Sequence, residues 1–418
     1  MITAVEGTRD ILPEQSAAWQ RVEAVARELF ARYGYREIRT PVFEQTELFA
    51  RGIGAETDVV SKEMYTFEDQ DRQRSSLTLR PEATAGIVRA VIQHSLFQTD
   101  PALRVYALGP MFRRERPQAN RYRQFHQVDV EVFGVAAPSV DAEVVELAMA
   151  YLEGCGASGA ELILNSVGDR RCRPAYVETL RQALGAEASR LCGDCQRRSQ
   201  TNPLRVLDCK VPADQPLIDA LPRIYDHLCA DCRDHFAEVR RELDLLGVRY
   251  RLSHRLVRGL DYYTRTTFEI VSDALGAQNS MLGGGRYDGL VQELGGPDLT
   301  GIGFALGLER LIRMLPPAPE PPRCDVFVAP LAGAARDPAL KLQRELRRAG
   351  LRVLMEHEGR GLKAQMKRAD KLGARYVVLI GENELATGVW SIRDMAGSSQ
   401  EQVEAAGVAA HIEGKIHG

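Results

Sequence analysis

A proline-rich stretch near residue 320 divides the chain into two parts with different sequence patterns. Residues Pro316–Pro322 read PPAPEPP, and consecutive prolines form a semi-rigid spacer that neither a helix nor a sheet accommodates. Beyond this spacer, apolar strand-like segments alternate with helix-like segments, which is typical of a mostly parallel sheet covered by helices. We therefore predict a first domain over residues 1–320 and an α/β domain over residues 323–418.

The elements expected after the spacer can be bounded from the pattern. They are strand Asp325–Leu331, helix Pro338–Ala349, strand Leu351–Glu356, helix Leu362–Gly373 and strand Arg375–Ile380. Basic residues outnumber acidic ones in this part, and those in the helices and turns include Arg347, Arg348, Arg352, Lys363, Lys367, Arg368 and Lys371. Charge alone leaves two interpretations open, a nucleic-acid-binding face and a solvated helix face.

The first part begins with a helix and contains a long hairpin. Apolar residues recur at helical spacing from about Ser16 to Tyr33, and a short strand over Glu37–Thr40 follows. Residues Arg104–Gly134 are expected to form an antiparallel hairpin. In its second strand, Phe125–Phe133, the valines share one face with His126, and the other face carries Gln127, Asp129 and Glu131. The simplest interpretation of this alternation is a half-solvated strand.

A cysteine-rich segment at about residues 170–245 differs from its surroundings and is interpreted as a helical insert. In a cytoplasmic chain its cysteines should be reduced thiols or metal ligands rather than disulfides. Two CxxC pairs, Cys192–Cys195 and Cys229–Cys232, could close one tetrahedral zinc site. The gap between the pairs is wider than in zinc ribbons, and Cys209 adds a further possible ligand. The alternative is that these cysteines are buried small apolar residues or free thiols.

Arginines and glycines form three further clusters in the first part. The hairpin loop carries Arg113, Arg114, Arg116 and Arg121, whose planar guanidinium groups suit phosphate oxygens. A second cluster reads RGLDYY over residues 258–263. A third, glycine-dense cluster covers Gly283–Asp288 and Gly301–Leu311, where glycine lets backbone approach a ligand or a packed neighbour. The chain has neither a GxxxxGK[ST] loop nor a strand–GxGxxG–helix unit, so a nucleotide would bind by another route.

Composition excludes some classes of protein without selecting a function. The formal net charge of −3 neither supports nor excludes nucleic-acid binding, which depends on local patches. No apolar run is long enough to span a bilayer, so no membrane partner is expected. The opening residues, MITAVEGTRD, lack the charged-then-apolar pattern of a secretory signal, and we expect a cytoplasmic location.

The order and wording of these segments resemble class II aminoacyl-tRNA synthetases, specifically the histidyl-tRNA synthetase family. The resemblance covers nearly the whole chain, with the insert least secure. It is carried by Gly7–Asp10, Ile38–Pro41, Leu79–Thr84, Phe112–Glu131, Arg258–Tyr263, Gly283–Asp288 and Gly301–Leu311. The resemblance implies an α+β catalytic core with an antiparallel sheet, a helical insert and a C-terminal α/β anticodon-binding domain.

The resemblance also implies roles for individual residues. Arg113 and Arg258 would flank the α-phosphate of ATP as catalytic groups, and Arg121 and Arg310 would hold the outer phosphates. Phe125 would stack on adenine, Glu115 would help hold the nucleotide, and Mg²⁺ would neutralise phosphate charge. The residues implied for histidine are Glu82, Thr84 and Gln127 at its amino group and Glu131 and Tyr263 at its imidazole, with Tyr262 as a further histidine-binding residue.

The implied activity is that of a histidine–tRNA ligase, with ATP, L-histidine and the histidine tRNA as substrates and partners. A homodimer is implied by the family alone. One alternative is a non-catalytic regulatory paralogue that acts in histidine biosynthesis. Such paralogues lack the intact catalytic segment and the C-terminal domain, whereas this chain has RGLDYY at residues 258–263 and a C-terminal domain. Another alternative, a synthetase for a different amino acid, would need side-chain readers other than Glu131 and Tyr263.

Overall fold

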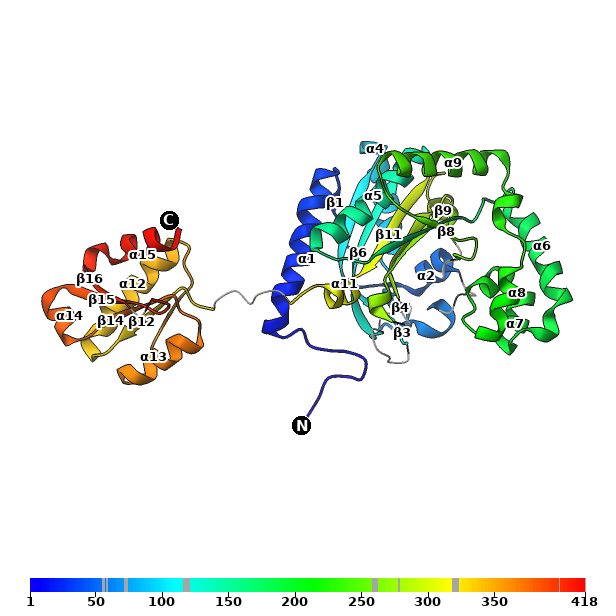
Figure 1. The fold of residues 1–418 in the computed structure, drawn as a ribbon. Helices are drawn as coiled ribbons and strands as arrows, with labels where there is room; N and C mark the ends of the chain where they lie inside the picture. The colour runs from blue at the N-terminus through cyan, green and yellow to red at the C-terminus, as the bar shows by residue number, and fades with distance from the viewer. Residues whose placement is uncertain are drawn as a thin grey trace. The chain divides into compact units, whose positions relative to one another are not determined.

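The computed structural model divides the chain into two compact units, Met1–Ala318 and Pro319–Gly418 (Figure 1). It describes residues 1–54, 57, 59–70, 74–115, 121–257, 262–276, 279–317, 323–397 and 399–417. Each unit has its own apolar core, because the buried clusters of residues 1–318 and those of the C-terminal unit share no members. The two units are therefore described separately.

The first unit is built on an eight-stranded sheet. In spatial order its strands are β1 (Arg36–Glu37), β5 (Arg104–Phe112), β6 (Gln124–Phe133), β11 (Gly301–Gly307), β10 (Ser280–Arg286), β9 (Thr264–Val271), β7 (Glu161–Ser166) and β8 (Arg251–Leu252). The pairings at the two edges, β1 with β5 and β7 with β8, are parallel, and the pairings between β5 and β7 are antiparallel. The predicted antiparallel catalytic-type sheet and its hairpin are thus confirmed.

Helices cover both faces of this sheet and leave one part open to a cavity. The helices outside the insert are α1 (Pro13–Arg32), α2 (Thr46–Ile53), α3 (Thr84–Gln93), α4 (Leu96–Thr99), α5 (Pro138–Cys155), α10 (Leu290–Glu293) and α11 (Leu308–Met314), with a π-helical turn at Val59–Glu63. One face of the sheet packs its valines against α1 and α5, and the other packs against α3 and α10. A small sheet of β2 (Phe43–Gln45), β4 (Ser76–Leu79) and β3 (Tyr65–Glu68) stands beside it.

The predicted first helix is confirmed, whereas two details of the predicted strands are wrong. Helix α1 starts with Pro13 at its first turn and buries the apolar face that the spacing indicated. Only Arg36–Glu37, rather than residues 37–40, form β1. The N–H of Ile38 still donates to the Tyr106 carbonyl at 2.8 Å, whereas the carbonyl of Thr40 accepts from the guanidinium of Arg80 at 3.1 Å. Strand β6 is not half-solvated: residues 127–133 are all buried, with Val128, Val130 and Val132 in the main core.

The helical insert leaves the sheet after β7 and returns to it at β8. It consists of α6 (Arg173–Ala186), α7 (Gly193–Thr201), α8 (Gln215–Asp219) and α9 (Ala230–Leu245), joined by short 3₁₀ turns. Its own apolar core includes Tyr176, Leu180 and Val206. Helix α9 packs along α5, and His235 of α9 lies 2.9 Å from Asp141 of α5.

A buried charge network joins α9 and α5 to the central sheet. Asp141 Oδ1 accepts from Arg286 Nε of β10 at 3.1 Å, and Asp141 Oδ2 lies 2.9 Å from His235 Nε2. Arg286 and Asp141 are fully buried; burial alone would raise the pKa of Asp141, but its hydrogen bond to His235 and the charge of Arg286 hold that pKa below its ordinary value. Arg286 therefore has a structural explanation outside ligand binding, since removing one partner of a buried pair costs about 3–5 kcal/mol.

The C-terminal unit is an α/β domain with a five-stranded sheet. Its strands, in spatial order, are β13 (Val353–Met355), β12 (Val326–Pro330), β14 (Tyr376–Ile380), β15 (Val389–Asp394) and β16 (Gln400–Glu404). Its helices are α12 (Arg336–Arg348), α13 (Leu362–Lys371), α14 (Glu382–Thr387) and α15 (Val408–His417). The first three strands are parallel, as the alternation predicted, and the last two add antiparallel pairings that the alternation did not indicate.

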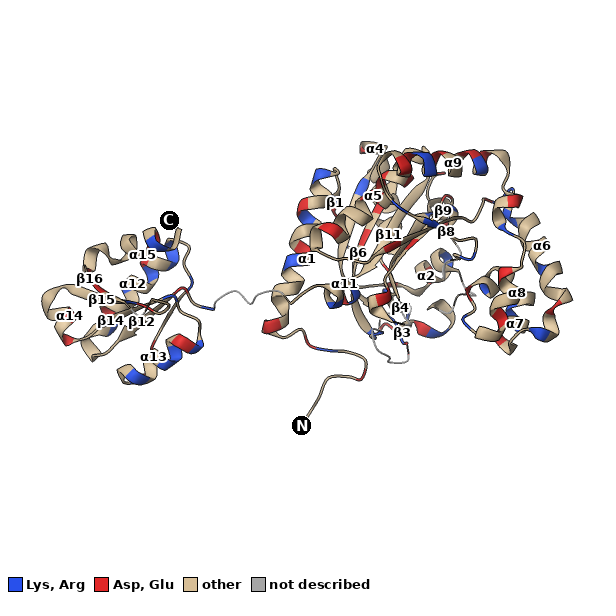
Figure 2. Ribbon diagram, in the orientation of Figure 1, with Lys and Arg blue, Asp and Glu red and all other residues tan. Residues whose placement is uncertain are grey.

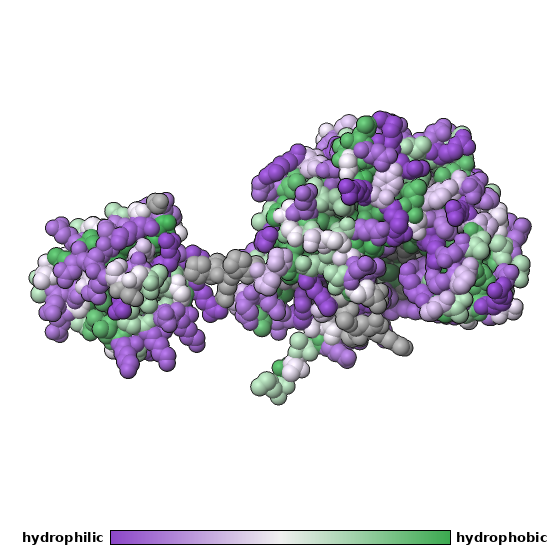
Figure 3. Space-filling view, in the orientation of Figure 1, coloured by the Kyte–Doolittle hydropathy of each residue, from purple (hydrophilic) through white to green (hydrophobic). Residues whose placement is uncertain are grey.

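Surface character differs little between the visible faces of the two units. Figure 3 shows mostly hydrophilic residues on each, with scattered apolar ones between them. Lys and Arg are visible on α13 and α15 in the C-terminal unit (Figure 2). Within the described part of the chain, no helix has both the length and the apolar character needed to cross a membrane.

Candidate active site

One cavity of the first unit gathers eleven of the residues singled out from the sequence. It lies on the face of the central sheet formed by β6, β10 and β11. The predicted residues that line it are Glu82, Thr84, Arg113, Glu115, Arg121, Phe125, Gln127, Glu131, Tyr262, Tyr263 and Arg310. Residues that lie up to about 230 positions apart in the sequence, such as Glu82 and Arg310, therefore meet in one cavity. Arg258, predicted as a catalytic group, lies outside the described residues.

Three arginines form a cationic cluster in this cavity, which we call the arginine cluster. Arg113 and Arg121 come from the chain that joins β5 to β6, and Arg310 comes from the first turn of α11. Burial lowers the pKa of the Arg310 guanidinium, and the positive charges of Arg121 and Arg113 lower it further, although it stays protonated. The three guanidinium groups share one cavity and their positive charges repel each other, so a bound polyanion would relieve that repulsion.

Neighbouring groups set the orientation of the arginine cluster. Arg113 donates from Nε to the carbonyl of Pro81 at 2.9 Å, and its guanidinium lies 5.3 Å from the ring centroid of Phe125. Arg310 donates to the carbonyl of Ser280. Arg121 lies 2.9 Å from Glu115, measured from Nη1 to Oε2. These contacts come from three separate segments, so the cluster is held by the fold rather than by one loop.

The second group in the cavity is polar and largely buried, and we call it the acid–tyrosine cluster. It comprises Glu82, Thr84, Glu131, Tyr262 and Tyr287. Glu131 Oε1 accepts from the Thr84 hydroxyl at 2.6 Å, and Glu131 Oε2 accepts from the Tyr287 hydroxyl. Burial raises the pKa of Glu131 to about 8, and these two hydrogen bonds only partly oppose that rise. Burial likewise raises the pKa of Tyr262.

Glu82 is positioned by the start of helix α3. Its carboxylate accepts from the backbone N–H of Thr84 at 3.0 Å and from that of Ala85 at 2.8 Å. Burial raises the pKa of Glu82, and both hydrogen bonds counteract this rise because they favour the charged form. A buried carboxylate next to Glu131 creates a site that would favour a cation such as an ammonium group.

Two glycines of β11 make room for the acid–tyrosine cluster. A Cβ on Gly303 would lie 1.9 Å from Glu131 Oε2, and a Cβ on Gly301 would lie 2.2 Å from the ring of Tyr287. Both separations are far below van der Waals contact, so no side chain fits at either position. The glycine-dense run in the sequence therefore serves the close approach of two side chains to the sheet.

The sequence interpretation missed the role of one residue in this region and the burial of another. Tyr287 lines the cavity and donates to Glu131, yet only the segment that contains it was singled out. Asp129 lies on the same face of β6 as Gln127 and Glu131; it is fully buried, and neither of its carboxylate oxygens has a hydrogen-bond partner among the described residues. Burial, with the charges of Glu131 and Glu82, raises its pKa well above the ordinary value. The period-2 alternation located both acids but not their burial.

The expected single site with four cysteines is not what the structure contains. Cys192 and Cys195 group with Cys209 and Asp214, whereas Cys229 and Cys232 group with Asp169 and Cys172. The expectation of one shared zinc site is therefore wrong. The reason is that each CxxC pair opens a different helix, α7 or α9, and each helix start finds its own partners in the chain.

Comparisons with known proteins agree with the geometry. A family model described as Histidyl-tRNA synthetase matches residues 7–311, and one described as Anticodon binding domain matches residues 325–415. The chain is 53% identical to the histidine–tRNA ligase of Koribacter versatilis, with 99% of this chain and 96% of that protein covered. It is 54% identical to the histidine–tRNA ligase of Solibacter usitatus, with 99% of each chain covered.

Solved structures give the same grouping. The crystal structure of apo histidyl-tRNA synthetase from S. aureus superposes with a TM-score of 0.83 at 38% identity, covering 99% of this chain and 100% of that one. A structure described as an ATP phosphoribosyltransferase regulatory subunit/histidyl-tRNA synthetase from Bacillus halodurans reaches a TM-score of 0.67 at 21% identity, which shows only a shared fold. From its sequence, its fold and the residues of its cavity, the chain belongs to the histidyl-tRNA synthetase family.

Proposed function

We propose that this chain is a histidine–tRNA ligase. The observation that carries the proposal is the meeting, in one cavity, of an arginine cluster with an acid–tyrosine cluster. The first suits a triphosphate, and the second suits a small cation with a ring that forms hydrogen bonds. The relatives with about half of their residues identical are named histidine–tRNA ligases, which supports the same assignment.

In the proposed first step, a carboxylate oxygen of histidine attacks the α-phosphorus of ATP. The bond from that phosphorus to the oxygen bridging to the β-phosphate breaks, pyrophosphate leaves, and histidyl-adenylate forms. Negative charge builds on the α-phosphate oxygens, so preorganised cations lower the barrier. We assign Arg113 and Arg258 to the α-phosphate and Arg121 and Arg310 to the outer phosphates.

Other groups of the cavity are proposed to hold the nucleotide and its metal ions. Phe125 stacks on adenine, and Glu115 helps hold the nucleotide. When bound with ATP, Mg²⁺ neutralises phosphate charge and takes one or two carboxylates as further ligands. Glu115 would be a candidate for such a ligand, because its carboxylate lines the cavity beside Arg121, with Oε2 2.9 Å from Arg121 Nη1.

Histidine is proposed to bind at the acid–tyrosine cluster. Glu82, Thr84 and Gln127 hold its ammonium group, and Glu131, Tyr262 and Tyr263 read its imidazole. A carboxylate accepts from one ring N–H, and a phenol hydroxyl pairs with the other nitrogen. Buried polar groups discriminate strongly against side chains that leave them unpaired, so this arrangement would select histidine over other amino acids.

In the proposed second step, a ribose hydroxyl of the terminal adenosine of the tRNA attacks the adenylate carbonyl. The ester bond forms, the bond from the carbonyl carbon to the phosphate oxygen breaks, AMP leaves, and the hydroxyl proton is released to solvent. We assign the catalytic domain to residues 1–320 and anticodon contacts to residues 323–418, which include the basic helices α12 and α13. Family membership supports a homodimer in the cytoplasm as part of the same proposal.

The experiment that tests the function is ATP–pyrophosphate exchange with a panel of amino acids. Histidine alone should support exchange, because only an imidazole forms hydrogen bonds with both the carboxylate and the phenol hydroxyl of the cavity. Exchange that depends on another amino acid would assign a different synthetase. No exchange with any amino acid, from protein that binds histidine, would instead indicate the non-catalytic regulatory class.

A further inference from the structure

Six of the eight cysteines gather, with two aspartates, in two small clusters at the insert. In the first, the ligand atoms of Asp169, Cys172, Cys229 and Cys232 all lie within 4.8 Å of one another. In the second, the same holds for Cys192, Cys195, Cys209 and Asp214. Each cluster thus offers three thiols and one carboxylate. We call them the base cluster and the tip cluster, respectively.

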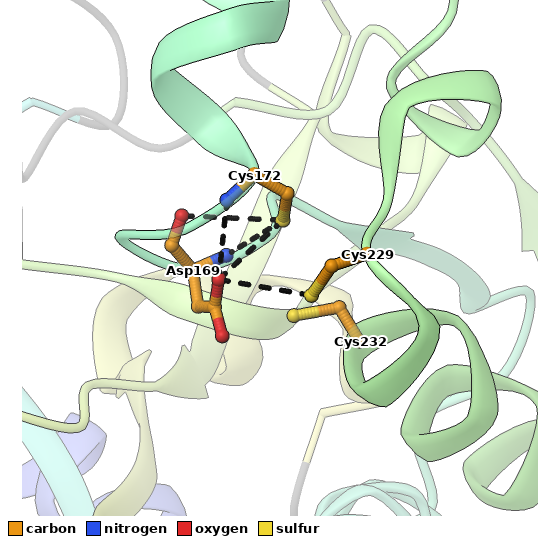
Figure 4. Close-up of side chains that lie close together, drawn as sticks. All are labelled: Asp169, Cys172, Cys229 and Cys232. Atoms are coloured by element: carbon orange, nitrogen blue, oxygen red, sulfur yellow. Dashed lines mark hydrogen bonds between the residues drawn. The ribbon is translucent and has the colours of Figure 1, made fainter.

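The base cluster is formed by two short segments that lie far apart in the chain. Asp169 and Cys172 stand just before α6, and Cys229 and Cys232 open α9, so each pair has i, i+3 spacing. Figure 4 shows the sulfurs of Cys229 and Cys232 facing Asp169 and Cys172. Asp169 Oδ1 lies 3.5 Å from the sulfur of Cys172 and 4.0 Å from that of Cys229.

The surroundings of the base cluster orient its ligands as metal sites require. The second oxygen of Asp169 accepts from Arg171 Nε at 3.1 Å and Nη2 at 2.9 Å. Oδ1, which faces the thiols, is held by the backbone N–H groups of Arg171 at 2.9 Å and Cys172 at 3.3 Å. The sulfur of Cys172 accepts from the backbone N–H of Asp169 at 3.3 Å. Outer partners of this kind fix the direction of the ligands of a metal ion.

The tip cluster has the same composition and a different chain path. Cys192 and Cys195 open α7, and Cys209 and Asp214 follow in the next segment. The sulfurs of Cys192 and Cys209 are 4.0 Å apart, and the Cys209 sulfur lies 3.3 Å from Asp214 Oδ2. Asp214 is only 1% exposed, so an acidic group is buried among thiols.

These distances match a four-coordinate ion. With zinc–sulfur bonds of about 2.3 Å, the sulfurs of a tetrahedral site lie roughly 3.8 Å apart, close to the separations above. Thiols that were only small apolar residues would not need a buried carboxylate beside them. Three thiolates exclude magnesium and calcium, which prefer oxygen, and a single carboxylate in place of the fourth cysteine argues against an iron–sulfur cluster.

We propose that the helical insert binds two zinc ions, one in each cluster. The ion in the base cluster would join the first helix of the insert, α6, to its last helix, α9, because it links Cys172 at the start of α6 to Cys229 at the start of α9. Arg173, the next residue, donates to the carbonyls of Val167 at 3.0 Å and Gly168 at 3.1 Å, and also to the carbonyl of Tyr263, which lines the cavity. The tip ion holds α7 against the 3₁₀ turn at residues 203–208.

The first test is the zinc content of the full chain, purified without chelators and measured by plasma mass spectrometry. Wild-type protein should hold about two zinc ions per chain, and Cys229→Ser and Cys192→Ser should each hold about one. Cys155→Ser and Cys324→Ser are matched controls, since both cysteines are buried outside the clusters, and these variants should keep both ions. Zinc-free wild-type protein, or equal loss in the controls, would reject the proposal; an unchanged content in either cluster variant would reject that cluster's site.

A second test does not depend on the serine variants folding. Wild-type protein loaded with Co²⁺ in place of zinc should show thiolate-to-cobalt charge transfer and tetrahedral d–d absorption. Asp169→Cys should keep its metal and shift these bands, because one oxygen ligand becomes sulfur. Absence of thiolate–cobalt bands in wild type would reject both sites, and an unchanged spectrum in Asp169→Cys would reject Asp169 as a ligand.

Discussion

Tyr287 donates a hydrogen bond to Glu131 on the face of β11 where Gly301 and Gly303 leave room for both side chains. The carboxylate belongs to β6, the phenol belongs to the residue directly after β10, and both are buried in the wall of the cavity. The bond therefore orients the residue that we assign to the imidazole of histidine.

Replacing Tyr287 with Phe should raise the KM for histidine about tenfold and leave the KM for ATP unchanged, because a hydrogen bond to a carboxylate contributes about 1.5–3 kcal/mol. Pyrophosphate exchange with each substrate varied in turn measures both constants. Tyr151→Phe is the matched control, since Tyr151 is buried and donates to the Val22 carbonyl at 3.0 Å away from the cavity. An equal rise in both KM values would contradict the assignment.

The raised pKa of Glu131 gives the free protein a pH-dependent stability. Burial raises the pKa from 4.5 to about 8, so the native state keeps a proton that the unfolded state has lost between those values. The free energy of unfolding contributed by this group therefore falls as pH rises through that window, by at most about 1.4 kcal/mol per pH unit.

Denaturant unfolding of wild type and Glu131→Gln between pH 5 and pH 8, roughly the window of this titration, measures that contribution. The variant should lose less stability than wild type as pH rises, because its amide does not titrate. Parallel pH profiles for the two proteins would show that Glu131 ionises normally in the native state.

Gly303→Ala should destabilise the protein by about 1–3 kcal/mol and strongly impair histidine activation, because its Cβ would meet Glu131 Oε2 and the Val130 carbonyl. Gly185→Ala in α6 is the control, since its Cβ would meet nothing within 4 Å. That change should be neutral or stabilise by up to about 1 kcal/mol. Thermal unfolding and pyrophosphate-exchange assays on both variants measure these two effects. A Gly303→Ala protein with wild-type stability and wild-type exchange would be inconsistent with the described packing.

Arg258→Ala should lower ATP–pyrophosphate exchange by about 1,000-fold while the protein stays folded, since one preorganised charge at a transition state contributes on that scale. The comparison variant is Arg190→Ala, whose side chain pairs at the surface of the insert with Glu187. Exchange near the wild-type rate in Arg258→Ala would remove Arg258 from the catalytic groups.

Deleting residues 323–418 should reduce tRNA charging by about 100-fold or more, the loss expected when several kcal/mol of tRNA binding are removed. Adenylate formation should persist, because the first unit has its own core. Single-turnover assays of each step compare the two losses. Losses of equal size would argue against a separate tRNA-reading role for this part of the chain.

The sequence pattern located the hairpin, the first helix and the parallel half of the C-terminal sheet because each repeats with a clear period. It could not show that both faces of β6 are buried, since that depends on helices and strands from elsewhere in the chain. The family resemblance named most residues of the cavity, yet it missed Tyr287, whose role appears only when β10 lies beside β11. The sequence pattern also could not show which residues lie next to the cysteines. Asp169 and Cys172 lie about 60 residues before Cys229 and Cys232, the CxxC pair that they meet in the fold.

The most direct measurement of the central claim is a crystal structure with ATP and histidinol, an alcohol that lacks the reacting carboxylate. The imidazole should contact Glu131 and a tyrosine of the cavity, with the α-phosphate beside Arg113 and the outer phosphates at Arg121 and Arg310. Density for either ligand outside this cavity, or an imidazole with no contact to Glu131, would contradict the account.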